Sequence, residues 1–474
     1  MLRKLFSHTA IYGLAPHVSK LASFFVLPII TQYLTPLDYG IYGVLTATVG
    51  SISVFSSLGL RVVLVNSFFK SPGQYKWLWR QIYGFLSIWV IPYAIISSIL
   101  VYFIVPSEAH EHIWTIIGLN VAPIVLFGQT NTLASTYYQV NKKPLPIAIR
   151  TAVFSTLTVL LNLYLIAILK LGYMGWLWST FIVGILQNAS YWIPLNLKFK
   201  IYPIYRFKWR TIRNSLRVSL PTVPHFYSSY LLNASDRLIM GVLNLSTGDI
   251  GKYNAAYTFG NYFSNLGNAS GFAVGPLLNE CYRSREDEKA RNLIFVQQTA
   301  FLVMSFTCCI WLKELFQFFI RNDQLNKMYY LAVIIVMAYN YRPMYFGANA
   351  KLLYLERTRA ILRVSFGAGL INVLLNLALI PLMGFEVAAY TTFFSLMYMG
   401  YAGYFMKAFR ESTQTNYYPL FWLGLTILLT VVAYYVVHFD WHVKAILTCC
   451  LVPGIAYLYF RLKHKVQDTR NEFR

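Results

Sequence analysis

Four basic side chains and one acid lie inside long apolar stretches of this sequence. The cations are Lys20, Arg61, Arg237 and Arg342, and the acid is Asp236. A charge near the centre of a bilayer costs at least ~2.5–3.5 kcal/mol unless it faces water or a partner, so we expect these side chains to point inward. A guanidinium can hold a phosphate through two hydrogen bonds, and an ammonium adds a point charge. Four cations against one acid therefore predict a binding site for an anion.

Asp236 has two interpretations. It could pair permanently with a cation, and Lys20 or Arg342 is the partner we would expect. Alternatively, it could take up a proton or Na⁺ in each transport cycle. We favour the ion pair. His17 lies three residues before Lys20, on the same helical face. It could gate proton movement, although at a turn that contains Pro16 we expect it to hydrogen-bond the backbone.

The sequence offers little for covalent, metal or nucleotide chemistry. It has no G-x-x-x-x-G-K-[ST] motif for ATP. Its five cysteines form no C-x-x-C pair and no Cys/His cluster with zinc spacing; they are Cys281, Cys308, Cys309, Cys449 and Cys450. We therefore expect no metal site and no cofactor.

The charged residues must be positioned by membrane-spanning helices. Of 474 residues, 57% are hydrophobic and only 12% are charged. Apolar stretches of about 20 residues, long enough to cross a bilayer, recur along the whole chain. We predict an all-α polytopic membrane protein with about 14 transmembrane helices. They cover residues 8–34, 39–69, 80–105, 112–139, 146–169, 173–196, 217–243, 249–279, 291–319, 325–350, 360–381, 385–407, 418–438 and 441–460.

The positions of the charges predict the topology. A net charge of +23 would suggest nucleic acid in a soluble protein, but here the cations lie mainly in short connections between apolar spans, so no nucleic acid is expected. On the side shared by both termini we count 30 of the 40 Lys and Arg residues, against six on the other side. Positive charge accumulates on the cytoplasmic side, so both termini are predicted to be cytoplasmic.

The longest connection covers residues 198–216. Together with Arg217 it carries seven basic residues that alternate with Tyr, Phe and Trp. This pattern is typical of a helix that lies in the cytoplasmic membrane interface and touches anionic membrane lipids. The alternative is a docking site for the anionic headgroup of a substrate.

An internal repeat divides the chain. The segment LTPLDYGIY at 34–42 matches LSTGDIGKY at 245–253 with an offset of 211 residues. Asn162 and Asn376 stand in equivalent VLLNL segments, and we expect both to hydrogen-bond neighbouring helices. Six helices per repeat give both copies the same orientation, related by an axis along the membrane normal. We predict an N-terminal lobe of six helices, a basic interfacial linker, a C-terminal lobe of six helices, and two further helices with a basic cytoplasmic tail, at 1–197, 198–216, 217–407 and 408–474.

The same segments carry a family resemblance. LTPLDYGIYGV, DRLIMGVL and NVLLNLALIPLMGFEVAAYTT resemble the polysaccharide-transport branch of the multidrug/oligosaccharidyl-lipid/polysaccharide (MOP) exporter superfamily, which includes the Wzx-type O-antigen flippases. The resemblance implies a multi-pass protein of the bacterial cytoplasmic (inner) membrane in lipopolysaccharide or related polysaccharide biosynthesis. It implies a substrate of the undecaprenyl pyrophosphate type, an oligosaccharide repeat unit moved to the outer leaflet by alternating access. A polysaccharide polymerase is a possible partner.

Two other functions compete with this interpretation. A multidrug exporter of the same fold is expected to line its pocket with acids for organic cations, whereas the interior here is basic. A membrane enzyme of the same pathway needs a catalytic residue set on a long external loop. The external connections predicted here are about four to ten residues long, so we expect no enzyme.

Overall fold

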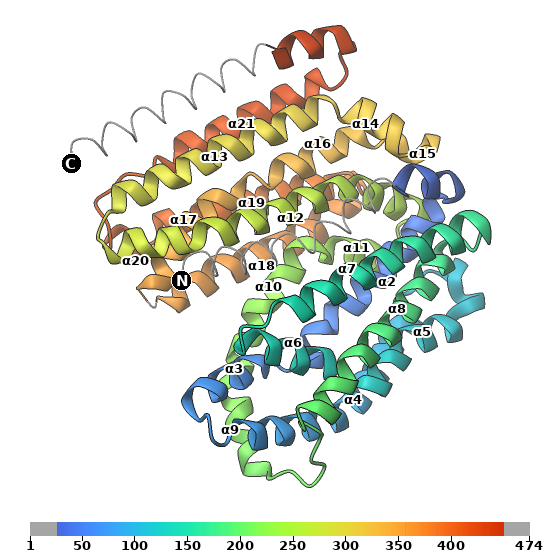
Figure 1. Cartoon of the computed structure of the whole chain (residues 1–474). Helices are drawn as coiled ribbons and strands as arrows, with labels where there is room; N and C mark the ends of the chain where they lie inside the picture. The colour runs from blue at the N-terminus through green and yellow to red at the C-terminus, as the bar shows by residue number, and fades with distance from the viewer. Residues whose placement is uncertain (1–25, 356, 450–474) are drawn as a thin grey trace.

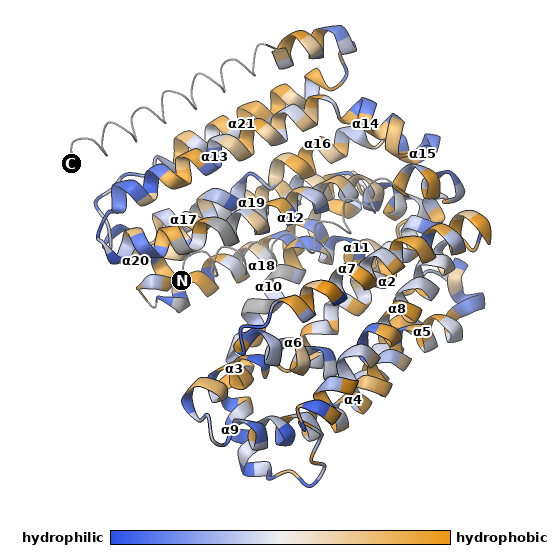
Figure 2. Cartoon of the chain, viewed as in Figure 1, coloured by the Kyte–Doolittle hydropathy of each residue, from blue (hydrophilic) through white to orange (hydrophobic). Residues whose placement is uncertain are grey.

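The computed structural model describes residues 26–355 and 357–449 of the chain (Figure 1). In these ranges the regular structure is entirely helical, which confirms the predicted all-α fold class. Seven helical segments are long and apolar enough to cross a membrane by themselves: 36–70, 75–104, 107–127, 145–168, 287–310, 359–383 and 419–436. Figure 2 shows that apolar residues cover most of these helices.

After helical residues at 26–30, the first half of the described chain forms seven α-helices and five short helical turns. They are η1 (Thr31–Tyr33), α2 (Pro36–Ser53), η2 (Val54–Ser56), α3 (Arg61–Lys70), α4 (Tyr75–Ile104), η3 (Ser107–His112), α5 (Ile113–Phe127), α6 (Thr130–Val140), α7 (Leu145–Asn162), η4 (Leu163–Ile168), α8 (Tyr173–Ile193) and η5 (Pro194–Lys198).

The second half begins with the amphipathic helix α9 and ends with α21 and a helical segment at 441–449. Its elements are α9 (Trp209–Ser219), η6 (Leu220–Thr222), α10 (Val223–Asn233), α11 (Ser235–Val242), α12 (Thr247–Arg283), α13 (Asp287–Ile310), α14 (Leu312–Phe319), α15 (Asp323–Asn326), α16 (Tyr329–Ala338), α17 (Tyr341–Tyr354), α18 (Thr358–Met383), α19 (Val387–Phe405), α20 (Lys407–Arg410) and α21 (Pro419–Val436).

Several of the predicted spans are broken helices rather than continuous ones. The span expected at 39–69 is divided between α2 and α3 at Gly59, which has a φ of +68°. The span expected at 112–139 breaks at Gly128, with a φ of +53°. A break in a membrane helix is tolerated where neighbouring protein or water satisfies the freed backbone groups. The α10–α11 and α16–α17 breaks bracket the candidate site described below.

The internal repeat is visible in matching local structures. Thr35 caps α2 by accepting a hydrogen bond from the backbone nitrogen of Asp38, and Ser246 caps α12 in the same way through Asp249. The two helices pack against each other with both N-termini at one end, so the two copies have the same orientation (Figure 1). The predicted amide contacts are also confirmed. Asn162 accepts a hydrogen bond from the Ser179 hydroxyl on α8. Asn376 accepts the equivalent bond from Thr391 on α19.

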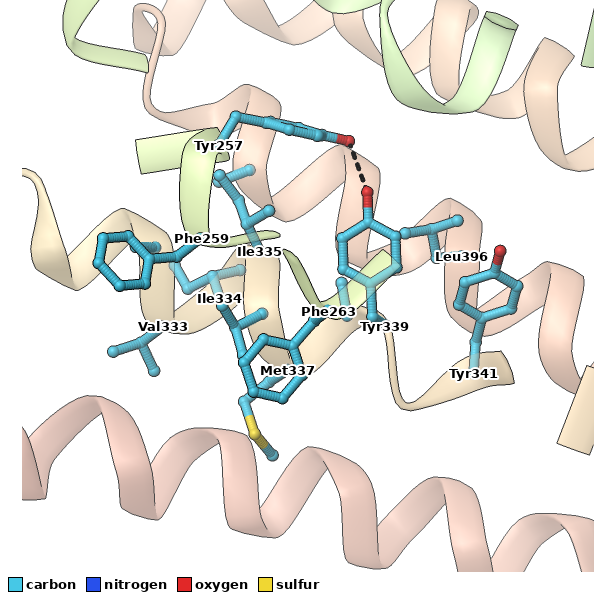
Figure 3. Close-up of a cluster of buried hydrophobic side chains, with 14 of the residues drawn as sticks. Tyr257, Phe259, Phe263, Val333, Ile334, Ile335, Met337, Tyr339, Tyr341 and Leu396 are labelled. Carbon is cyan, nitrogen blue, oxygen red and sulfur yellow. Dashed lines mark hydrogen bonds between the residues drawn. The ribbon is translucent and has the colours of Figure 1, made fainter. Parts of the chain in front are cut away.

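Helix α16 forms the centre of the second lobe. All its residues from Leu331 to Ala338 are buried. A helix that is apolar on every side must be surrounded by others. Figure 3 shows its side chains packed against Phe259, Phe263 and Tyr257 of α12.

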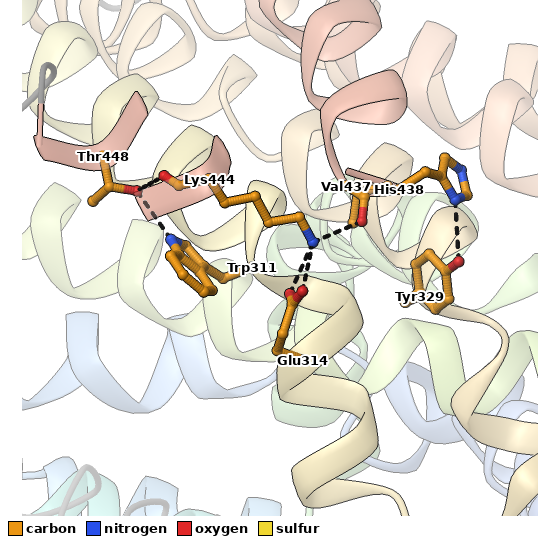
Figure 4. Close-up of polar contacts among 7 residues, drawn as sticks. All are labelled: Trp311, Glu314, Tyr329, Val437, His438, Lys444 and Thr448. Atoms are coloured by element: carbon orange, nitrogen blue, oxygen red, sulfur yellow. Dashed lines mark hydrogen bonds and ion pairs between the residues drawn. The ribbon is translucent and has the colours of Figure 1, made fainter. Parts of the chain in front are cut away.

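Two polar contacts hold the C-terminal helices against this lobe (Figure 4). The Lys444 ammonium, fully buried, lies 2.7 Å from the Glu314 carboxylate on α14. The Trp311 indole nitrogen donates to the Thr448 hydroxyl at 3.0 Å. Nearby, partial desolvation and the Lys313 and Lys444 ammonium groups lower the pKa of His438. Lys444 is therefore part of a buried ion pair.

The basic linker packs against the first lobe. The helix α9 begins within it at Trp209 and continues past its end to Ser219. The apolar face of α9 is directed at α3 and α4, with Ile212 completely buried. Arg210, Arg213 and Arg217 are exposed on its other side. The expected helix is present, but it covers its apolar face with protein.

Candidate functional site

Two of the predicted site residues, Lys20 and His17, lie outside the described residues, so their roles remain predictions. The other four predicted residues are described. Asp236, Arg237 and Arg342 belong to the second lobe, on α11 and α17. Arg61 is the first residue of α3 in the first lobe.

Asp236 is buried and held by two hydrogen bonds. Its carboxylate accepts one from the Tyr253 hydroxyl on α12 and one from the backbone nitrogen of Arg237, at 2.9 Å for the second. Within residues 26–355 and 357–449, Asp236 makes no ion pair. The expected pair with Arg342 is not formed, because Arg342 extends to a different part of α12. Lys20 remains a predicted partner.

Arg237 is the most informative residue of the site, because its side chain is only 7% exposed. The guanidinium carbon lies 4.2 Å from the centre of the Tyr257 ring. Nη1 donates to the backbone oxygen of Asn233 at 3.1 Å. Nε and Nη2 have no hydrogen-bond partner in the described structure. These two nitrogens form the edge of the guanidinium that binds a phosphate or carboxylate through two parallel hydrogen bonds.

Arg342 lies where α16 gives way to α17. Its guanidinium donates to the Asn268 amide oxygen and, at 3.3 Å, to the Ser264 hydroxyl, both on α12. A β-carbon added at Gly267 would lie 3.1 Å from the Arg342 Cδ, so this glycine makes room for the side chain. Arg342 is partly buried, and its Nε has no partner in the described structure.

A group of tyrosines connects the two arginines. The Tyr339 hydroxyl donates to the Asn233 amide oxygen at 3.1 Å and lies 3.5 Å from the Tyr257 hydroxyl (Figure 3). The backbone nitrogen of Arg342 in turn donates to the Tyr339 backbone oxygen at 3.1 Å. Sequence reasoning did not identify these tyrosines. The four-residue spacing of Tyr253 and Tyr257, which puts them on one face of α12, was the available signal.

Arg61 does not join this group. It is exposed, and its Nη2 donates to the Gln139 amide oxygen on α6 at 2.7 Å. The break at Gly59 places Arg61 at the start of α3 instead of inside a continuous span. The structure therefore places Asp236, Arg237 and Arg342 in one lobe and Arg61 in the other.

A buried polar network extends the site to α18 and α19. The Ser235 hydroxyl lies 3.4 Å from the Asn372 amide oxygen. Asn372 also accepts from the Asn376 amide at 3.2 Å. Its own amide nitrogen donates to the Thr392 hydroxyl at 3.4 Å. Buried polar groups that are satisfied in this way fix helix positions, so α11, α18 and α19 are held as one unit beside Asp236.

The two lobes are joined at the end where α2 and α12 begin. The Thr247 hydroxyl donates to Glu108 of η3 at 3.0 Å. The Asn254 amide donates to the Tyr39 backbone oxygen at 3.1 Å. The Asn322 amide donates to the Leu34 backbone oxygen at 3.1 Å. The charge distribution predicts that this end faces outward, so the lobes are in contact on that side.

Comparisons with known proteins agree with this architecture. Residues 5–282 match a family model described as "Polysaccharide biosynthesis protein". A comparison with curated protein sequences finds no match.

Solved structures of transporters share the fold. A structure titled "Lipid II flippase MurJ, inward closed conformation" aligns with a TM-score of 0.67 and 13% identity, over 90% of this chain and 97% of that one. The MATE transporter VcmN of Vibrio cholerae aligns with a TM-score of 0.58 and 15% identity, over 88% and 98%. An inward-facing multidrug resistance MATE transporter of the MOP superfamily gives 0.57 and 12%, over 89% and 96%.

These identities show the shared fold, and the family match covers more than half of the chain. This multi-pass membrane protein belongs to the polysaccharide biosynthesis protein family.

Proposed function

We propose that this protein is a flippase that moves a polyprenyl-pyrophosphate-linked oligosaccharide repeat unit across the bacterial inner membrane. The substrate carrier is of the undecaprenyl type, the direction is from the cytoplasmic to the outer leaflet, and both termini are cytoplasmic. Anionic membrane lipids and a polysaccharide polymerase are the partners this function implies. No covalent chemistry is needed, because the protein supplies a polar path for a headgroup that cannot cross hydrocarbon unaided.

One observation carries the proposal: the Arg237 guanidinium is buried, and its Nε and Nη2 donors have no partner among residues 26–355 and 357–449. A buried donor without a partner costs about 1–3 kcal/mol, more for a charged group. An anionic ligand that accepts both bonds removes this cost. A pyrophosphate offers adjacent oxygens for such a fork. Arg342 contacts α12 two to three turns further along, at Ser264 and Asn268, so it would line the substrate path instead of sharing this phosphate group.

The contacts between the lobes suggest how the site is exposed to one side at a time. In this structure α2 and α12 are in contact at the end predicted to be external. A headgroup bound at Arg237 would leave outward only after these contacts separate. Asp236, the residue before Arg237, could either balance the Arg237 charge or take up a proton or Na⁺ as the lobes move.

A multidrug exporter is the second candidate, because MATE transporters share the fold. An organic cation needs an acid in its site, and in the described part of the chain Asp236 is the acid with a fully buried side chain. The two functions thus depend on neighbouring residues of opposite charge.

Transport by the purified protein in proteoliposomes distinguishes the flippase from the multidrug exporter. We expect it to move a fluorescent polyprenyl-pyrophosphoryl sugar between leaflets, measured by its accessibility to an impermeant quencher. We expect Arg237→Gln to abolish this movement, whereas Arg359→Gln, which removes an exposed cation from the first turn of α18, should not. Uptake of an organic cation that depends on Asp236 but not on Arg237 would favour the exporter.

A further inference from the structure

The connection before α9 is fixed along α4. We call residues 199–208 the strap. The Ile204 backbone nitrogen donates to the Arg80 oxygen at 3.0 Å, and the Lys208 nitrogen donates to the Gln81 side chain at 2.6 Å. A β-carbon added at Gly84 would lie 1.9 Å from the Ile204 oxygen, so only glycine permits this approach. The strap is therefore held in a fixed position on the surface of the first lobe.

A hollow of about 460 Å³ lies between the strap, α4, α8 and the end of α5. On α4 it is lined by Tyr83, Ser87 and Val90, which share one helical face. From Tyr83 to Val90 the helix rises roughly 10 Å along its axis. The far wall is formed where α5 ends at Gly128. We call this hollow the strap groove; Phe127, Trp192, Asn196, Leu197, Tyr202 and Tyr205 also line it.

The strap groove has a mainly apolar lining, which includes the polar Ser87 and Asn196, and a basic rim. Trp192, Leu197 and Tyr205 are exposed along its mouth. Lys200 and Arg206 are also exposed, and they flank the groove-lining part of the strap on either side. The strap and α9 are largely hydrophilic beside the more apolar α4 and α8 (Figure 2). Tyrosine and tryptophan next to Lys and Arg are typical of the boundary between hydrocarbon and headgroups.

The Arg80 guanidinium reinforces this positive rim. Its carbon lies 3.8 Å from the centre of the Tyr202 ring, and its Nε donates to the Tyr202 backbone oxygen at 3.3 Å. This contact fixes a positive charge one helical turn from Tyr83, at the strap end of the groove. An occupant must therefore combine an apolar chain with an anionic head.

We propose that the strap groove binds one anionic phospholipid of the cytoplasmic leaflet. An acyl chain lies along Ser87 and Val90, and the headgroup phosphate lies beside Lys200 and Arg206. The length of the groove suits part of one chain, and the seven basic residues of the 198–217 segment supply complementary charge. The site is separate from Arg237 and Arg342, so the inference does not depend on the transported substrate.

The test uses the full-length protein in detergent, titrated with phosphatidylglycerol or phosphatidylcholine that carries bromine atoms in the acyl chains. Bromine quenches nearby tryptophan, and the contribution of Trp192 is the difference between wild type and Trp192→Phe. We expect quenching of Trp192 with a preference for phosphatidylglycerol. Each Lys or Arg beside an anionic lipid surface raises the affinity of the protein for that lipid about five-fold. Removing two of them in Lys200→Gln/Arg206→Gln should therefore reduce the preference for phosphatidylglycerol by roughly twenty-five-fold.

Two further variants make the test specific. Lys142→Gln/Lys143→Gln removes two exposed cations from another connection on the same predicted side and should leave the preference unchanged. Ser87→Phe should fill the groove and abolish Trp192 quenching by both lipids, while the melting temperature reports that the protein is folded. Quenching that persists in Ser87→Phe would overturn the groove as the site. Equal affinity for the two lipids, or displacement of phosphatidylglycerol by a lower concentration of polyprenyl phosphate, would overturn the assigned ligand.

Discussion

Gly40 of α2 and Gly251 of α12 are equivalent positions of the internal repeat, and each packs against the backbone of the other's helix. A β-carbon at Gly40 would lie 1.9 Å from the Thr247 backbone oxygen, and one at Gly251 would lie 1.8 Å from the Pro36 oxygen. Pro36 and Thr247 are themselves related by the offset of 211 residues. The contact between the lobes is therefore symmetric in detail, and it explains why both copies of the motif carry glycine.

Adding a methyl group at either glycine should weaken this contact. Overpacking typically costs ~1–3 kcal/mol, so we expect Gly40→Ala and Gly251→Ala each to lower the melting temperature of the purified protein. Gly248→Ala is the matched control in the first turn of α12, where the nearest atom would be 4.0 Å away. The reciprocal contact would be contradicted by three variants with the same melting temperature.

Removing Lys444 and removing Glu314 from their ion pair should destabilise the folded protein to different extents. Lys444 is fully buried, whereas the Glu314 side chain is 31% exposed. Glu314→Gln leaves a buried ammonium without its carboxylate, and breaking a buried pair costs ~3–5 kcal/mol. Lys444→Met leaves a carboxylate that water can reach, so this variant should lose less stability than Glu314→Gln.

Thermal unfolding of both single variants and of the double variant checks this prediction. The double variant should recover much of the stability lost by Glu314→Gln. Equal losses in the two single variants would show that the ammonium is solvated in the folded protein.

Asp236→Asn should reduce the amount of folded protein, because Arg237 loses the negative charge beside it in a buried site. Expression and the melting temperature are the measurements, and Asp236→Asn/Arg237→Gln should recover part of the loss. The competing role is ion coupling. A well-folded Asp236→Asn protein whose transport no longer depends on pH or Na⁺ would establish coupling instead.

The sequence predicted the helical class, the repeat and the interior position of Arg237 and Asp236, because these follow from hydropathy and spacing. It did not predict how the helices break. Gly59 turns Arg61 into the exposed first residue of α3, and the break before Tyr341 directs Arg342 to Asn268. These outcomes depend on which helices become neighbours after folding. The same is true of the Tyr253 hydroxyl that bonds Asp236.

The predicted topology can be checked by labelling single cysteines in a cysteine-free protein with an impermeant thiol reagent. Cysteines at Ser107 and Lys170 should react from outside intact cells, and those at Lys142 and Arg285 should not. All four side chains are exposed, so differences in reactivity report sidedness. Thr247 lies at the same predicted end but is buried against Glu108, which makes it unsuitable. Reaction with the opposite sidedness would reverse the orientation.

The most direct measurement of the central claim is the affinity of Arg237 variants for a soluble short-chain polyprenyl pyrophosphate. A hydrogen bond to a charged group contributes about 1.5–3 kcal/mol, or roughly 10- to 150-fold in affinity, so losing the two bonds of the Arg237 fork should raise Kd by at least that factor in Arg237→Gln. The Kd of Arg237→Lys, which keeps the charge but not the fork, should lie between those of wild type and Arg237→Gln. The Kd of Arg359→Gln should equal that of wild type. Wild-type affinity in a folded Arg237→Gln protein would contradict the account.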